Sequence, residues 1–266
     1  MLNALKTLLR AQPERRSAAV PAGQRAYALG DIHGRADLLE PLIAAIEADD
    51  AAAGPAQTTV ILLGDLVDRG PDSARVIALA REWAGRRPVR FIAGNHEEML
   101  LQSLGSVDVL RTFLKHGGRE TLLSYPVNAE AFQAASFEEV QGLMAEAIPP
   151  ADLAFLAGFE DWIRLGDYLF VHAGIMPDVP IERQRQGDLR WIREPFLSHP
   201  GDHGAIVVHG HTITDEAEVL PNRIGIDTGA YFSGRLTALA LEGTTRRLIE
   251  AREEAGRIAI HTRSIA

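Results

Sequence analysis

Carboxylates, imidazoles and one carboxamide recur along this chain, each just after a short apolar run and each beside a glycine. Together these groups suit a pair of borderline divalent ions such as Mn²⁺, Fe²⁺ or Zn²⁺. One such residue alone is more often a turn former, a helix cap or a structural histidine. Because five loops share the pattern, we predict that they meet in a dinuclear metal site. The residues concerned are Asp31, His33, Asp65, Asn95, His96, His172 and His211.

The loop from Gly64 to Gly70 carries the widest range of chemistry. Asp65 has two carboxylate oxygens and can therefore bridge two ions. Asp68 can handle protons, and the guanidinium of Arg69 matches the oxygens of a phosphate group. The loop follows four apolar residues typical of a buried strand, and α/β sheets bind their ligands beyond such strand ends. Taken alone the loop is ambiguous, because an Asp at a strand end is more often a turn former or a helix cap than a metal ligand.

Three strand–loop–helix units in succession must position these side chains. Apolar runs at residues 27–29, 60–63 and 89–93 each lead into a polar loop and then into helical apolar spacing. This order predicts a layered α/β fold with at least three parallel strands, whose loops fall on one edge of the sheet. Further strands are expected at 162–165 and 168–171, which form a hairpin, and then at 205–208, 223–227, 236–241 and 248–261.

The chain divides into an N-terminal extension and one large domain. We assign residues 1–24 to the extension and residues 25–266 to a single catalytic domain, with a helical insertion at about 107–158. The insertion is too short to have much core of its own. The extension has helical apolar spacing with Lys6 and Arg10, which indicates a surface helix. An amphipathic helix lying on a membrane is the alternative.

The composition is that of an ordinary globular protein and excludes several functional classes. Of 266 residues, 46% are hydrophobic, and the net charge of −9 argues against a nucleic-acid-binding surface. Anionic substrates stay open, because bound divalent ions reverse the local field. The absence of cysteine excludes disulfides, thiolate zinc sites and cysteine-nucleophile phosphatases, and it fits a reducing, cytoplasmic location. No apolar run approaches the length of a membrane span.

Five motifs together resemble those of the calcineurin-like metallophosphoesterases, specifically the PPP-type serine/threonine protein phosphatases. They are Gly30-Asp31-Ile32-His33-Gly34, the stretch Gly64 to Gly70, Gly94-Asn95-His96-Glu97, His172-Ala173-Gly174 and Gly210-His211-Thr212. Residues 191–194 and 226–230 resemble the small bacterial and bacteriophage members, and the match runs over residues 27–241. The resemblance implies a four-layer α/β fold (α+β in some schemes), in which helices flank a central two-sheet β-sandwich with two metals at one edge.

The same resemblance implies a role for each site residue. The residues that match ligands of the first metal are Asp31, His33 and Asp65. Those that match ligands of the second are Asp65, Asn95, His172 and His211. His96 matches the general acid and Asp68 the carboxylate that orients it, and the groups that match the phosphate-binding set are Arg69, Arg193 and Asn95. Two such ions can hold a bridging hydroxide for in-line attack on phosphorus. We expect Mn²⁺, with Fe or Zn as alternatives.

We therefore predict a metal-dependent phosphoric monoester hydrolase that acts on phosphoserine and phosphothreonine in proteins, with phosphotyrosine and small phosphate esters as further substrates. The alternative is a bis(5'-nucleosyl)-tetraphosphatase, from a sister group that resembles this chain but has glutamine at the position of His33 and no acidic residue at Asp68. A non-catalytic scaffold is disfavoured, because no expected ligand is missing. The native substrate and the oligomeric state stay open.

Three more polar residues near these motifs have an ordinary structural explanation beside a functional one. His116 precedes two glycines and could contact substrate, but a cation at a helix C-terminus is the simpler account. His209 is expected to pack or to support the site, because it lies deeper along the strand than His211. Asp227 is expected to form a turn or to accept a hydrogen bond from behind the ligands.

Overall fold

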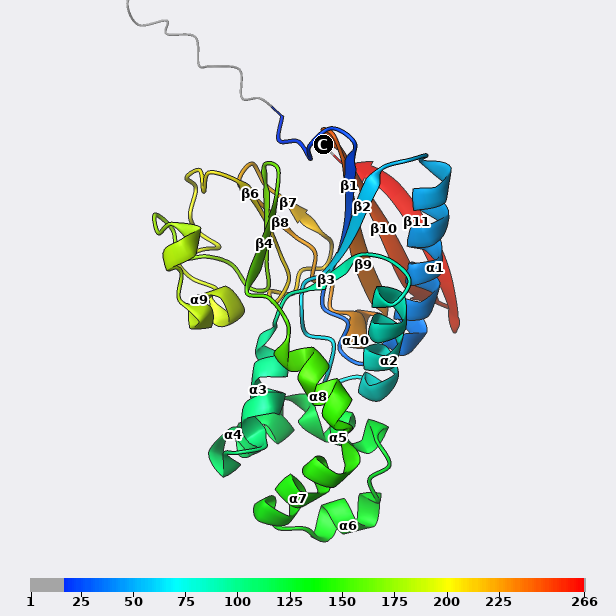
Figure 1. The fold of residues 1–266 in the computed structure, drawn as a ribbon, viewed down its shortest axis with the longest axis vertical. Helices are drawn as coiled ribbons and strands as arrows, with labels where there is room; N and C mark the ends of the chain where they lie inside the picture. Colours follow the sequence, from blue (N-terminus) through cyan, green and yellow to red (C-terminus); the bar gives the residue numbers. More distant parts are fainter. Residues whose placement is uncertain (1–16, 266) are drawn as a thin grey trace, which may run out of the picture.

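Two β-sheets packed face to face form the centre of the protein (Figure 1). The computed structural model describes residues 17–265. One sheet has six strands and the other has five. Helices cover the outer face of the six-stranded sheet, and a short helix with its loops covers the outer face of the other. The predicted α/β architecture, a two-sheet sandwich between outer layers, is confirmed.

The six-stranded sheet combines parallel and antiparallel strands. Its members, in spatial order, are β11 (Arg257–Ile265), β10 (Thr245–Glu254), β9 (Arg235–Glu242), β1 (Gln24–Leu29), β2 (Gln57–Leu62) and β3 (Val89–Phe91). β1, β2 and β3 run parallel, as three strand–loop–helix units require. The prediction of a single edge strand at 248–261 was wrong, because the chain forms the hairpin β10–β11 there. Ala255 opens its turn with φ 51°, and alanine is an unusual residue for that left-handed position.

The five-stranded sheet receives the later part of the chain. Its strands, in spatial order, are β4 (Trp162–Leu165), β5 (Tyr168–Val171), β6 (Ile206–His209), β8 (Arg223–Gly225) and β7 (Glu218–Val219). The expected β4–β5 hairpin is present, and Gly166 takes the left-handed conformation in its turn at φ 59°. β5, β6 and β8 run parallel, so their carboxyl ends meet at one edge.

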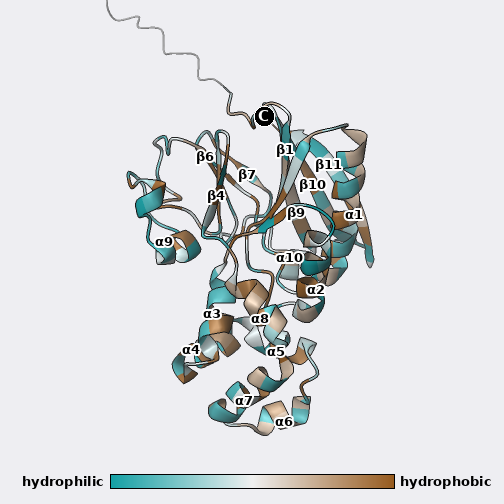
Figure 2. Ribbon diagram, in the orientation of Figure 1, coloured by the Kyte–Doolittle hydropathy of each residue, from teal (hydrophilic) through white to brown (hydrophobic). Residues whose placement is uncertain are grey.

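The central strands are buried on both faces. In β1, Ala26 and Ala28 face the second sheet, whereas Tyr27 and Leu29 face the covering helices. Because alternate side chains point to opposite faces, a strand buried on both sides reads as a continuous apolar run. Figure 2 shows apolar residues, in brown, on central strands such as β9 and hydrophilic residues, in teal, on outer helices such as α7.

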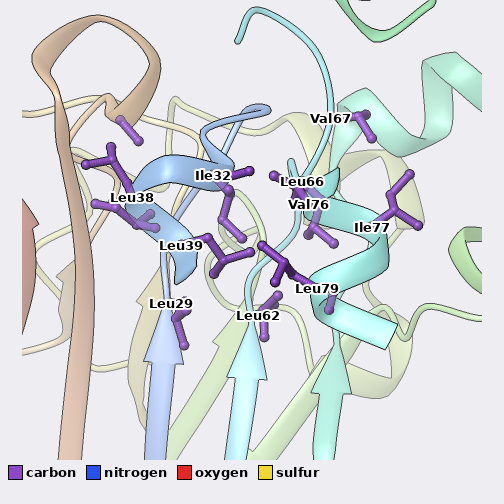
Figure 3. Close-up of a cluster of buried hydrophobic side chains, with 14 of the residues drawn as sticks. Leu29, Ile32, Leu38, Leu39, Leu62, Leu66, Val67, Val76, Ile77 and Leu79 are labelled. Atoms are coloured by element: carbon purple, nitrogen blue, oxygen red, sulfur yellow. The ribbon is translucent and has the colours of Figure 1, made fainter. Parts of the chain in front are cut away.

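Two helices cover the outer face of the six-stranded sheet close to the loops. Leu38 and Leu39 of the first helix and Val76 of the second are buried above Leu29 and Leu62, which end β1 and β2 (Figure 3). Each buried side chain of this size contributes about 1.5–3 kcal/mol. The packing therefore fixes both ends of each loop. The two helices are α1 (Ala36–Ala52) and α2 (Ser73–Ala84).

Helices also make up the chain between β3 and β4, and they lie below the sheets in Figure 1. The stretch expected to be helical at about 107–158 contains helices from Val107 to Ala157. One π-helical turn, η1, is irregular, because His116 and Gly117 leave helical backbone there. The elements are α3 (Asn95–Ser103), α4 (Val107–Phe113), η1 (Leu114–Gly118), α5 (Arg119–Ser124), α6 (Ala129–Ala134), α7 (Phe137–Ala147) and α8 (Pro150–Ala157).

Three short helical elements follow β5. They are η2 (Ile181–Arg183), α9 (Gln186–Trp191) and α10 (Ala230–Ser233). Leu189 of α9 packs with Phe196 on Val171 and Val207, which are on the outer face of the five-stranded sheet. α10 lies instead between the loops and β9 (Figure 1).

The N-terminal region is described from Ser17 onward. The surface helix expected from the apolar spacing around Lys6 and Arg10 therefore lies outside the described residues. Val20 is buried and donates its backbone N–H to Gly243, and the backbone N–H of Ala19 donates to the carboxylate of Asp167. The division into an extension at 1–24 and one domain with an insertion stays a prediction. Among the described helices, none is both long and apolar enough to cross a membrane.

Candidate metal centre

The predicted site residues converge where the parallel strands of both sheets end. Asp31 follows β1, Asp65 follows β2, and His172 directly follows β5. Hydrogen bonds tie these ends together: the backbone N–H groups of Ile32 and His33 both donate to Asp65 O, at 3.1 and 2.8 Å. Asn95 and His96 form the first turn of α3, after β3, and His211 lies two residues beyond β6. Residues up to 180 positions apart are thereby brought into contact.

Left-handed backbone is concentrated at this site. Seven non-glycine residues in the described chain have positive φ, and five of them are site residues. These are His33 (47°), Asp65 (51°), Asp68 (73°), Arg69 (69°) and His211 (61°). Such conformations cost on the order of 1–3 kcal/mol each and persist only where the surroundings hold them. The strain indicates that the loops are shaped for the geometry of their side chains.

Two glycines make room for the carboxylates. A Cβ at Gly94 would lie 2.1 Å from Asp65 Oδ1, and a Cβ at Gly210 would lie 2.0 Å from Asp31 Oδ1. Any side chain at either position would displace a carboxylate from the site. Glycine is therefore required at both positions, because the carboxylate of a candidate ligand lies directly against the backbone there.

The ligand atoms form two groups that share Asp65. One consists of His33, Asp65 and His96, and the other of Asp65, His172 and His211; within each group the atoms lie within 4.8 Å of one another. Asp65 Oδ2 is 3.5 Å from His33 Nε2, while Oδ1 is 3.5 Å from His172 Nε2. The two oxygens of one carboxylate therefore face different groups, as a bridging ligand requires.

Asp31 lies beside the first group. Its Oδ2 is 4.0 Å from His33 Nε2, and both its oxygens accept the backbone N–H of His211 at 3.1 Å. Burial raises the pKa of Asp31 well above its usual range, and the nearby carboxylates of Asp227 and Asp65 add to the shift. A divalent ion would balance the charge of carboxylates crowded in this way.

The imidazole rings turn their acceptor nitrogens toward the groups. His33 Nδ1 lies 2.8 Å from the carbonyl oxygen of Val67, and His172 Nδ1 lies 2.8 Å from that of Leu63. A carbonyl only accepts, so each Nδ1 carries the proton and each Nε2 of the neutral ring presents a lone pair. Backbone carbonyls behind metal-binding histidines commonly fix the tautomer in this way.

Asn95 provides the clearest test of whether a cation fits. Its Oδ1 lies 2.9 Å from both His172 Nε2 and His211 Nδ1. Burial lowers the pKa of His172, so its ring is neutral and its Nε2 is an acceptor that faces a carbonyl oxygen. Acceptors that converge without a proton between them suit a metal ion. The residues present therefore fit a divalent metal pair.

A buried histidine–aspartate pair adjoins the first group. His96 Nδ1 donates to Asp68 Oδ2 at 2.6 Å, and both side chains are almost fully buried. Burial by itself would lower the pKa of His96, but the carboxylates of Asp65 and Asp68 outweigh that effect and raise it. For Asp68, burial raises the pKa more than the hydrogen bond from His96 lowers it. The pair can hold and move a proton beside the candidate metals.

The two predicted phosphate-binding arginines differ in how firmly they are held. Arg69 places Nη1 2.8 Å from His33 Nε2 and Nη2 2.9 Å from His96 Nε2. Its guanidinium also lies 4.9 Å from the centre of the Tyr231 ring. Arg193 is exposed, and within the described chain its side chain makes no hydrogen bond. It lies close enough to His211 to lower the pKa of that ring, after the larger effect of burial.

Two residues that contact the site were not assigned a role from the sequence. The carboxylate of Glu97 accepts the backbone N–H groups of Asp65, Leu66 and Gly94 at 2.9, 2.7 and 3.0 Å. Its position three residues after Gly94, at a helix start, is a capping-box signal that could have revealed it. Tyr231 lies edge-on to His33, with ring centres 5.5 Å apart, and no sequence pattern marks it.

The three residues left open lie at the margin. His116 is mostly exposed. The limited burial of its ring lowers its pKa, and the charges of His96, Lys115 and Arg69 lower it further. His209 lies outside both ligand groups; its Nδ1 is 3.0 Å from Gly210 O, and its ring packs on Phe196. Asp227 accepts the backbone N–H of Gly229 at 2.9 Å. The positions of His209 and Asp227 agree with packing and support.

Comparison with known proteins decides the family. Residues 25–232 match the calcineurin-like phosphoesterase family, which is more than half of the chain. The chain belongs to that family. It is therefore an enzyme that hydrolyses phosphate esters, and the predicted resemblance is confirmed. The family uses a dinuclear divalent metal centre, and this phosphoesterase has candidate ligand groups for one.

Two kinds of relative match this phosphoesterase over most of its length. It is 28% identical over 230 residues to serine/threonine-protein phosphatase 1 of Salmonella typhimurium, covering 81% of this chain and 91% of that protein. It is 27% identical over 230 residues to bis(5'-nucleosyl)-tetraphosphatase PrpE of Anoxybacillus flavithermus, covering 79% and 88%. The two relatives are named for different substrates, and this chain is nearly equally similar to both.

Solved structures share the fold of this phosphoesterase. One protein described as a candidate diadenosine tetraphosphatase has a TM-score of 0.60 and 21% identity, covering 93% of this chain and 98% of that one. A cold-active protein tyrosine phosphatase has a TM-score of 0.56 and 18% identity, covering 91% and 81%. At these identities the likeness concerns the fold alone.

Proposed function

We propose that this phosphoesterase is a phosphomonoesterase that removes phosphate from phosphoserine and phosphothreonine in proteins. Aryl phosphates, phosphotyrosine among them, are further substrates in this proposal. We also propose that Mn²⁺ fills the metal pair, that Fe or Zn can replace it, and that the enzyme works in the cytoplasm. The catalytic unit is residues 25–266, with residues 107–158 as its helical insertion.

The contact that carries the proposal is the 2.6 Å hydrogen bond between His96 and Asp68. Serine and threonine leave phosphorus as alkoxides, which are strong bases and need a proton in the transition state. A nucleoside phosphate leaves as a weak base and needs none. A buried imidazole oriented by its own carboxylate suits the first kind of leaving group. In this proposal His96 gives its proton to the leaving oxygen, and Asp68 stabilises the charged ring.

The metal ligands are assigned as the sequence predicts. Two bound divalent ions supply water activation near neutral pH and stabilise charge at phosphorus. The first would be held by Asp31, His33 and Asp65, and the second by Asp65, Asn95, His172 and His211. Support comes from the shared Asp65 and from the acceptor nitrogens of His33 and His172, each fixed by a backbone carbonyl.

The phosphate group binds between the two arginines in this proposal. Arg69 lies over both His33 and His96, so its donors can reach phosphoryl oxygens without a large movement. Arg193 approaches from the side of His211 with its guanidinium exposed. Asn95 can donate its amide N–H while its carbonyl oxygen faces the second group. Fixed donors aimed at developing charge are the largest single source of rate enhancement in such sites.

Hydrolysis of dinucleoside tetraphosphates is the second candidate. It is favoured by relatives of that name, to which this chain is as similar as it is to the protein phosphatase. His116 lies near Arg69 and next to Lys115, and the two side chains could meet additional phosphates. The presence of His33 and Asp68 argues only against the sister group considered above, which differs at both positions.

A direct comparison of substrates tests the proposal. Metal-free protein is reconstituted with Mn²⁺ and assayed with a phosphoseryl peptide, a phosphothreonyl peptide and diadenosine tetraphosphate at equal concentrations. We expect a higher kcat/KM on the peptides. A clear preference for diadenosine tetraphosphate would transfer the assignment to the second candidate. The His96→Asn variant is the matched control, because only the peptide reaction depends on a proton donor.

A further inference from the structure

The helical part of the chain at 107–158, here called the helical segment, reaches the site at one turn, formed by η1 and the start of α5. The hydroxyl of Thr121 donates to Asp68 Oδ1 at 2.6 Å, although the two residues are 53 positions apart. The carbonyl oxygen of Gly117 accepts the backbone N–H of Arg69 at 3.1 Å. Two neighbouring site residues are thus held from a part of the chain that supplies no candidate metal ligand.

The hydrogen bonds around Thr121 can be assigned to donors and acceptors. A carboxylate only accepts, so the single hydroxyl proton of Thr121 goes to Asp68. The hydroxyl of Ser73, 2.9 Å away, then donates to Thr121 Oγ1. The backbone N–H of Asp68 points at both hydroxyl oxygens, at 3.0 Å from Ser73 and 2.8 Å from Thr121. All three residues have 0% exposure, so bulk solvent does not compete for these bonds.

This assignment fixes the direction of the histidine–aspartate pair. Thr121 occupies Oδ1 of Asp68 and leaves Oδ2 for the N–H of His96 Nδ1. The ring of His96 is then held with Nε2 toward the candidate metals and Arg69. Without the hydroxyl, the carboxylate of Asp68 would lose a buried donor and be free to turn away from His96.

The irregular turn allows this close approach. Gly117 has φ 106°, and a Cβ there would lie 2.6 Å from Arg69 N. Asp68 and Arg69 themselves have φ 73° and 69°, so the loop needs contacts that hold it in that form. π-helical turns are frequent at functional sites. The distortion of the helix therefore has a local reason, which is contact with the loop.

We propose that Thr121 is a positioning residue for the reaction, whose hydroxyl fixes Asp68 so that His96 is aimed at the leaving oxygen. The turn at Gly117 holds the adjoining Arg69 in the same way. The inference rests on the proposed function, in which His96 protonates an alkoxide. Thr121 does not touch the substrate and acts through Asp68 and His96 alone. Its removal should therefore matter most for substrates that need the proton.

The test compares Thr121→Val, which keeps the shape, with Thr121→Ser, which keeps the hydroxyl. Turnover is measured on a phosphoseryl peptide and on p-nitrophenyl phosphate, whose leaving group departs without protonation. We expect Thr121→Val to lower kcat on the peptide about 10–100-fold, the loss typical of a residue that orients a functional group. Its effect on p-nitrophenyl phosphate should be much smaller, and Thr121→Ser should restore turnover on the peptide.

Ser73→Ala is the matched control. Its hydroxyl is equally buried in the same cluster but does not touch the carboxylate of Asp68. We expect it to lower the melting temperature as much as Thr121→Val does while leaving the ratio of the two activities unchanged. In a His96→Asn background, Thr121→Val should add little, because residues that act as a unit are not additive. Thr121→Ala replaces Thr121→Val if that variant fails to fold.

An equal loss on both substrates, or failure of Thr121→Ser to restore the peptide reaction, would show that Thr121 is only structural. Full additivity with His96→Asn would show the same. The His96→Asn variant separates the inference about Thr121 from the proposed acid role of His96, on which it rests. If its loss does not depend on the leaving group, the acid role of His96 and this inference both fall. If the loss in His96→Asn depends on the leaving group but the loss in Thr121→Val does not, only the inference about Thr121 falls.

Discussion

The two halves of the site are built differently. The half that follows the six-stranded sheet contains Asp65, Asp68, Arg69 and His96, and these residues bond to one another and to the helical segment. The half that follows the five-stranded sheet contains His172, His211 and Arg193. The ring of His172 contacts Leu63 O and Asn95 Oδ1, and that of His211 contacts Asn95 Oδ1. Neither ring bonds to the helical segment, and the Arg193 side chain is exposed.

The difference teaches where precision is needed. Groups that move a proton or meet developing charge must be held within about 0.5 Å of their working positions, which takes a second layer of contacts. Groups that admit a varied substrate can be mobile. We therefore expect substitutions in the first half to act on kcat and those at Arg193 to act on binding. Four measurements, from the largest expected effect to the smallest, can break or sharpen this contrast.

Metal removal should abolish the contrast altogether, because both halves share Asp65. After exhaustive chelation we expect activity on p-nitrophenyl phosphate to fall to the buffer background and to return with Mn²⁺. Loss of several kcal/mol of charge stabilisation corresponds to about 10³-fold or more in rate. Metal content, measured alongside, should approach two ions per chain. Full activity in the chelated protein would rule out metal catalysis.

His96→Asn tests proton transfer in the first half. We expect kcat on a phosphoseryl peptide to fall by about 10²–10⁴-fold, the usual contribution of a general acid. The fall on p-nitrophenyl phosphate should be far smaller, and the metal content should not change. Unchanged turnover on the peptide would remove His96 as the acid, and loss of metal would show that it serves as a ligand.

The two arginines test the contrast directly. Arg69→Ala should lower kcat by about 10²–10³-fold, as removal of a fixed donor at developing charge does. Arg193→Ala should instead raise KM and the inhibition constant of inorganic phosphate by about tenfold, since its charged hydrogen bond forms only with substrate. An unchanged inhibition constant in Arg193→Ala would reject its role in binding. A larger kcat effect there than in Arg69→Ala would reverse the contrast.

Tyr231→Ala should have the smallest effect. The ring supports the Arg69 guanidinium at 4.9 Å, and such a contact contributes about 0.5–1 kcal/mol at a partly exposed site. We expect a two- to fivefold fall in kcat, because the ring acts through Arg69. Tyr231→Phe, which keeps the ring, serves as the control and should behave as wild type. If Tyr231→Phe loses as much activity, the hydroxyl and not the ring contributes.

The sequence predicts the parallel strands and the convergence of the polar loops, because both follow from local patterns repeated at each strand end. It does not predict the β10–β11 hairpin, since Ala255 is an unusual turn residue. The second sheet came from resemblance, because strands that cross between layers leave no local signal. Thr121 escaped notice for the same reason: its partner Asp68 lies on another element, and a single buried threonine has no pattern.

The hydrogen bonds between the backbone of His211 and the carboxylate of Asp31 join residues that are 180 positions apart. A ribosome must therefore synthesise the chain as far as His211 before the last candidate ligand is available. Until then a growing chain has the first three strands and their loops but cannot complete the candidate metal site. Synthesis itself thus delays the appearance of hydrolytic activity, and an N-terminal fragment released early would be inert.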